Sequence, residues 1–84
     1  MTIETNGDLY RAMRDLAVIL EEGGEHELAV VVREALVVST APGEVLGESL
    51  LALERIRHHD AYGRLKLTHR IDEGIAYIRA ALGV

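Results

Sequence analysis

The sequence predicts an all-α fold: a single helical domain, residues 1–84, built as a small up-down-up-down four-helix bundle. Apolar residues recur at three- and four-residue spacing in four segments, and this is the spacing of one buried face of a helix. Glycine and proline mark the three breaks between the segments, at 23–24, 41–43 and 58–63. Short connections of this kind join antiparallel neighbours in helical bundles.

The first helix is expected to start near Asn6 or Asp8, either of which can act as its N-cap, and to run to Glu22. Its core face carries Leu9, Met13, Leu16 and Leu20. The pair Gly23-Gly24 then supplies residues that tolerate positive φ, as a helix end followed by a tight reversal requires.

The segment 28–38 is locally ambiguous, because its many valines favour a strand. We predict a helix, since a lone strand would have no pairing partner among helical neighbours. A helical wheel then places Val30 and Val37 on the outer side, beside the charged residues Arg33 and Glu34. The broad core face on this wheel consists of Leu28, Val31, Val32, Ala35, Leu36 and Val38.

The third helix is expected to begin near Pro42, with Ser39 or Thr40 as its cap. Proline is tolerated in the first turn of a helix because the N–H group that it lacks has no intrahelical partner there. Leu51 points away from its core face. That face carries Leu46, Leu50, Leu53 and Ile56.

The tract 58–63 is interpreted as a break in which Asp60 is a candidate N-cap. The fourth helix follows and ends at Gly83. Its apolar stripe consists of Leu67, Ile71, Ile75, Ile78 and Leu82.

Composition limits the function more than the fold. The net charge is −5, with ten acidic and three basic residues in 1–50 and four acidic and six basic residues in 51–84. This balance disfavours nucleic acid and anionic membranes, which attract basic surfaces. No apolar run approaches the roughly 20 residues of a membrane span, and the polar N-terminus does not resemble a signal peptide, so we expect a cytoplasmic protein.

Catalytic and metal-binding motifs are scarce. The chain has no cysteine, and neither Ser39 nor Ser49 lies in a recognisable triad motif, so we predict no enzyme. A metal site would have to rest on histidines and carboxylates. The candidates are His58, His59, Asp60, His69 and Glu73. We interpret them as a solvated loop and a polar helix face and predict no cofactor, with a metal- or ligand-binding bundle as the alternative.

The turn after the first helix is acidic, with Glu21, Glu22, Glu25 and Glu27 around His26. It lacks the alternating acidic pattern of a calcium loop. One interpretation is an ordinary solvated helix junction, and the other is a docking surface for a basic protein. The six basic residues of the second half are spread around two helices, so a helical nucleic-acid-associated regulator is only a third hypothesis.

Val30 and Val37, with Leu51 as a companion, allow two interpretations. Isolated exposed aliphatic residues are common on monomers. Alternatively, these residues form the centre of a subunit interface, because a two-fold contact buries one stripe against its own copy.

The run from Leu9 to Leu36, LYRAMRDLAVILEEGGEHELAVVVREAL, is similar to the first helical hairpin of small uncharacterised bacterial helical proteins. Some of these are of the type encoded beside toxins as immunity partners. The resemblance covers about a third of the chain and implies an all-helical fold and a protein partner.

Together these observations predict a small acidic protein-interaction module, an immunity- or antitoxin-type inhibitor of a basic partner, present as a homodimer or hetero-complex. The predicted partner-binding residues are Glu21, Glu22, Glu25, Glu27, Val30 and Val37.

Overall fold

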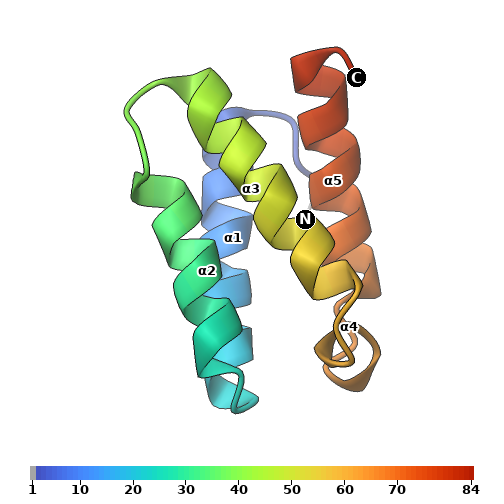
Figure 1. Cartoon of the computed structure of the whole chain (residues 1–84). Coiled ribbons are helices and arrows are strands. Elements are labelled where there is room, and N and C mark those ends of the chain that lie inside the picture. Colours follow the sequence, from blue (N-terminus) through green and yellow to red (C-terminus); the bar gives the residue numbers. More distant parts are fainter. Residues whose placement is uncertain (1) are drawn as a thin grey trace.

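A computed structural model describes residues 2–84 and confirms the all-α class, with no strand in that range. The valine-rich segment is a helix, as predicted. A one-turn helix within the tract expected to be a plain break was not predicted. The five helices are α1 (Asn6–Glu22), α2 (His26–Val37), α3 (Pro42–Arg57), α4 (Ala61–Arg64) and α5 (Thr68–Leu82) (Figure 1).

The four long helices form a closed set of contacts, in which α1 packs on α2, α2 on α3, α3 on α5 and α5 on α1. Figure 1 shows α1 and α2 side by side, with α3 crossing obliquely and α5 on the other side. The short α4 joins α3 to α5. The finer assignment of an up-down-up-down bundle stays a prediction.

The core between the helices is mainly aliphatic, and among residues 2–84 its one sulfur atom belongs to Met13. Helices approach closely where side chains are small: a methyl group on Gly74 of α5 would lie 2.8 Å from Leu53 Cδ1 of α3. The largest buried apolar side chains are Leu9, Met13, Leu20, Val32, Leu53, Ile56, Leu67, Ile71 and Ile78.

Two residues assigned to the core by the helical wheel are exposed, which corrects that prediction. Val38 is 54% exposed and Leu82 is 37% exposed. Both lie at helix C-terminal ends, where Val38 is the C-cap of α2 and Leu82 is the last residue of α5. A wheel gives the direction of a side chain but not whether a neighbouring helix reaches that far.

The N-cap of α1 is Thr5, not Asn6 or Asp8. The Asp8 N–H donates to Thr5 Oγ1 at 3.1 Å, and the Thr5 N–H donates to Asp8 Oδ2 at 3.2 Å, which makes a capping box. Hydrogen bonds from the backbone N–H groups of Glu4 and Thr5 lower the pKa of Asp8. Asn6 instead accepts a hydrogen bond from the Tyr77 hydroxyl at 2.6 Å.

The start of α3 also differs in its cap. Pro42 is the first helical residue, as predicted, but Ala41 holds the cap position in place of Ser39 or Thr40. Ser39 still contributes, because its Oγ accepts the Ala41 N–H at 3.0 Å. At α4, Asp60 holds the cap position without a side-chain capping hydrogen bond.

The end of α1 has the backbone geometry that its glycine pair predicts. Gly24 has a φ of 82°, and the Glu25 N–H donates to the Leu20 carbonyl at 2.8 Å. This hydrogen bond, which spans five residues across the helix end, is characteristic of the Schellman motif. The motif favours glycine at its left-handed position.

The end of α4 repeats this motif with a lysine in the left-handed position. Lys66 has a φ of 56°, and the Leu67 N–H donates to the Tyr62 carbonyl at 2.9 Å. The Tyr62 hydroxyl donates to Asp72 of α5 at 2.7 Å, a bond that raises the pKa of Tyr62. Lys66 is therefore held in a conformation that its side chain disfavours.

We expect Lys66→Gly to raise the free energy of unfolding by about 0.5–1 kcal/mol, because glycine removes the Cβ penalty of the left-handed region. Urea denaturation followed by circular dichroism measures this change. Lys66→Ala is the matched control, since it removes the charge but keeps the Cβ atom. An equal gain in both variants would attribute the effect to charge and contradict the explanation.

Candidate functional site

Glu21 of the acidic turn is engaged within the chain. Its carboxylate contacts His26 Nδ1 at 2.9 Å and Arg33 NH1 at 3.3 Å, both from α2. The hydrogen bond to His26, followed by that to Arg33, lowers the pKa of Glu21. This carboxylate therefore links the end of α1 to α2.

Glu25 is also engaged. It forms an ion pair with Arg64 of α4, and its Oε1 lies 3.9 Å from His59 Nε2. Arg64 reaches the same turn through its NH1, which lies 3.5 Å from the Gly23 carbonyl oxygen. Arg64 and His59 thus connect the turn between α1 and α2 to the segment around α4.

Glu22 and Glu27 differ from the other two glutamates of the turn. Both are exposed. Neither forms an ion pair or a side-chain hydrogen bond with another residue in the range 2–84. Of the four carboxylates predicted to form one docking surface, two are paired within the chain and two face solvent.

The adjacent histidines face different surroundings. His58 is exposed at the end of α3. His59 Nδ1 accepts the Ala61 N–H at 3.0 Å and lies 3.1 Å from Asp60 Oδ1. Because Nδ1 accepts that backbone proton, His59 is tied into the start of α4.

His69 and Glu73 pair one turn apart on α5, with 3.0 Å between Nε2 and Oε2. The other Glu73 oxygen accepts the Ile3 N–H at 2.7 Å. His69 and Glu73 line a cavity of about 310 Å³ whose other charged lining residues are Asp15, Lys66 and Arg70. No group of three or more metal-ligating side chains suited to a metal ion occurs within residues 2–84.

Ser39 and Ser49 lie in a turn and in the core, respectively. Ser39 caps the turn before α3. Ser49 is fully buried in α3, and its Oγ finds no hydrogen-bond partner among the described residues. Neither hydroxyl is hydrogen-bonded to a histidine in the described chain.

The outer side of α2 carries the valines that the helical wheel placed there. Val30 is 47% exposed and Val37 is 78% exposed. Glu27 and Glu34 lie on the same side of the helix, because steps of three and four residues return to one face. We call Glu27, Val30, Glu34 and Val37 the α2 outer stripe. Both of its carboxylates are without an ion-pair partner among residues 2–84.

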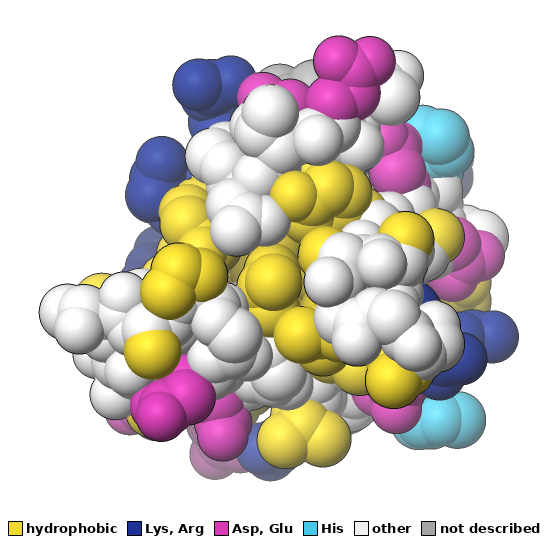
Figure 2. Space-filling view, turned by 90° about the horizontal axis from the view of Figure 1, so that it is seen from above, with side chains coloured by type: hydrophobic (Ala, Val, Ile, Leu, Met, Phe, Trp, Pro, Cys, Tyr) yellow, Lys and Arg dark blue, Asp and Glu magenta, His cyan; other side chains and the backbone are white. Residues whose placement is uncertain are grey.

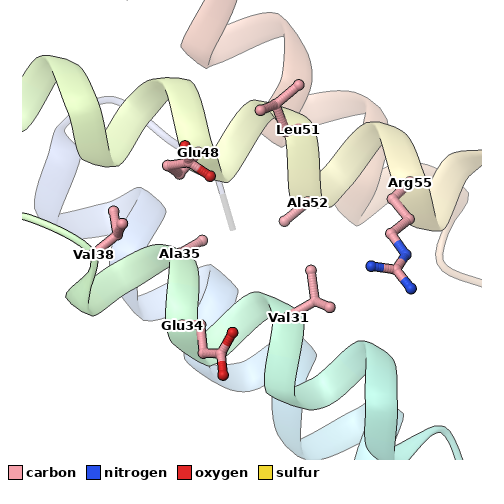
Figure 3. Close-up of a pocket in the computed structure, with 8 residues that line it drawn as sticks. All are labelled: Val31, Glu34, Ala35, Val38, Glu48, Leu51, Ala52 and Arg55. Carbon is pink, nitrogen blue, oxygen red and sulfur yellow. The ribbon is translucent and has the colours of Figure 1, made fainter.

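A groove of about 350 Å³ runs between α2 and α3 (Figure 3). Glu48 and Val38 lie at one end and Arg55 at the other, with Ala35 and Ala52 facing the space between the helices. Leu51 stands at the rim on α3 and is 63% exposed. The sequence indicated that Leu51 points outward, but the groove itself was not predicted. Its lining consists of Val31, Glu34, Ala35, Val38, Glu48, Leu51, Ala52 and Arg55.

Hydrophobic side chains also reach the surface at one end of the molecule. Figure 2, which looks onto the upper end of Figure 1, shows them gathered between the helix ends. Exposed hydrophobic surface therefore extends beyond the outer side of α2.

No helix in residues 2–84 combines the length and the apolar character needed to cross a membrane. The chain matches no protein-family model, and neither a curated protein nor a solved structure is significantly similar to it.

The lowered pKa of Glu21 predicts a pH dependence. A carboxylate whose pKa is lower in the folded chain adds stability above its unfolded pKa and loses that contribution as the pH falls. We expect the stability difference between wild type and Glu21→Gln to shrink as the pH falls below about 5, where the unfolded carboxylate begins to take up a proton. Urea denaturation at each pH measures it. The exposed neighbour gives the control: Glu22→Gln should show no such trend, and identical profiles for the two variants would refute the assignment.

The unpartnered hydroxyl of Ser49 predicts that Ser49→Ala raises the free energy of unfolding by about 1 kcal/mol, because a buried polar group without a partner is destabilising. Ser39→Ala should have the opposite sign, at about 0.5–1 kcal/mol, because it removes the acceptor for the Ala41 N–H. Chemical denaturation of the three proteins checks both signs. Destabilisation by Ser49→Ala would show that the hydroxyl contributes a favourable interaction.

Proposed function

We propose that this protein is a small acidic helical module that binds another protein in the cytoplasm, as an immunity- or antitoxin-type inhibitor of a basic partner. The observation that supports this proposal is the α2 outer stripe, in which two exposed valines alternate with two carboxylates. Inhibition would act by occlusion, with the module covering a functional surface of its partner. The four long helices, taken as an up-down-up-down bundle, would hold α2 as a rigid support.

The apolar part of the stripe favours a protein partner. Val37 is 78% exposed, and Val30 lies two helical turns away on the same side. Removing such side chains from water favours association by about 25 cal/mol per Å² of apolar surface buried, before the costs of association. Two valines at this spacing match the way in which a helix face contacts another protein.

The charged part of the stripe favours a basic partner. Glu27 and Glu34 have no basic partner among the described residues, so a lysine or arginine from another protein would not have to displace one. Charges of this kind mainly accelerate encounter and select among partners. Glu22 can add to this field, whereas Glu21 and Glu25 are already paired within the chain.

The histidine-based alternative lacks a comparable observation. The candidate ligands are divided between the α3–α4 connection and α5, and each is engaged locally or exposed alone. We therefore base no second function on them.

We expect Val30→Asp combined with Val37→Asp to weaken partner binding by about tenfold or more, because two charges would be placed against an apolar contact. Affinity capture of the partner from the source cell, followed by titration with the purified partner, measures this loss. The matched control combines Val18→Asp with Val84→Asp, which alters two exposed valines outside α2. Circular dichroism verifies the fold of both.

A second variant tests the charge. Glu27→Lys with Glu34→Lys should slow association and reduce its dependence on salt concentration.

If the variant with Val30→Asp and Val37→Asp bound the partner as tightly as wild type, the α2 outer stripe would not be the binding surface.

A further inference from the structure

One exposed face of α3 carries two opposite charges that have no partners among residues 2–84. Glu48 and Arg55 are seven residues apart, about 10 Å along the helix axis, so they point to the same side but are too distant to pair. Within the described residues, neither forms an ion pair or a side-chain hydrogen bond. Leu51, exposed by 63%, lies between them.

The spacing of these residues is symmetric about a point on α3. The midpoint between Glu48 and Arg55 falls between Leu51 and Ala52. Reversing the direction of the helix about this point exchanges Glu48 with Arg55 and Leu51 with Ala52. Such a pattern is self-complementary under a two-fold axis, which is the symmetry of most homodimers.

We propose that a second copy of this chain docks on the α2–α3 groove through α3, with the two α3 helices antiparallel. Glu48 of each copy pairs with Arg55 of the other, which gives two reciprocal ion pairs. Leu51 of each copy packs near Ala52 of the other, at the centre of the contact.

The charge layout identifies the occupant. A uniformly basic partner would place positive charge against Arg55, and a uniformly acidic partner would place negative charge against Glu48. A reversed copy of the same face satisfies both ends at once. Glu34, the third charged residue of the groove, points away from α3 in Figure 3 and therefore lies outside the proposed α3 contact.

The apolar part of the groove supports the same geometry. Ala35 and Ala52 are small and nearly buried, at 6% and 3% exposed, and they leave space between the two helices. Leu51 stands at the rim with more than half of its surface in solvent. A two-fold contact through α3 covers that leucine.

This inference is independent of the proposed function. It uses the face of α3 that carries Glu48, Leu51 and Arg55, whereas the proposed partner surface is the α2 outer stripe. Either surface can be disrupted while the other is left intact.

The test is a charge exchange followed by sedimentation equilibrium over a range of concentrations up to about 1 mM. In a two-fold dimer, Glu48→Arg alone creates two like-charged pairs, and so does Arg55→Glu alone. We expect each single variant to weaken dimerisation by about tenfold or more. The double variant E48R/R55E restores opposite charges at both positions and should dimerise nearly as well as wild type.

Two further variants complete the design. Leu51→Asp should abolish the dimer, whereas Val18→Asp, at an exposed position of α1, should leave it unchanged. Circular dichroism and melting temperature show that each variant is folded. A wild-type monomer at every concentration, or a double variant as weak as the single variants, would overturn the proposal. A dimer lost with Val30→Asp and Val37→Asp but kept with Leu51→Asp would overturn it as well.

Discussion

Burial of an aliphatic core is the interaction on which the rest of this structure depends. Without Phe or Trp, no single side chain fills much of the interior, so stability requires many Leu, Ile, Val and Ala contacts at close helix spacing. Gly74 shows how close this spacing becomes, because a methyl group there would collide with Leu53. The 12-residue α2 contacts both α1 and α3, and its outer side is left without a neighbour. Both proposed surfaces involve this helix or its groove with α3.

Features that depend on local chemistry were predictable from the sequence. Gly24, Pro42 and Gly83 mark helix boundaries because their backbone preferences act whatever surrounds them. The cap of α1 was not predictable in the same way, since Thr5, Asn6 and Asp8 are all competent caps. Asn6 is instead hydrogen-bonded to Tyr77, 71 residues away, and no local pattern indicates that bond.

In the candidate site too, features set by local sequence were predictable, and features set by contacts between distant segments were not. The exposure of Val30 and Val37 follows from helical periodicity alone, and the wheel placed them correctly. The partner of Glu25 did not follow, because Arg64 is 39 residues distant and reaches it only through the fold. Val38 was wrongly assigned to the core for a related reason: its exposure depends on where α2 ends relative to α3. The groove between these helices likewise requires knowing how they pack.

The hydrogen bonds that join the N-terminal segment to α5 bear on the order in which the chain folds. The Ile3 N–H donates to Glu73, and the Tyr77 hydroxyl donates to Asn6, across separations of 70 and 71 residues, respectively. Contacts between consecutive helices close short loops, whereas these contacts close a loop of nearly the whole chain and have a larger entropic cost. The α1–α5 interface is therefore expected to form late in folding and to open early in unfolding.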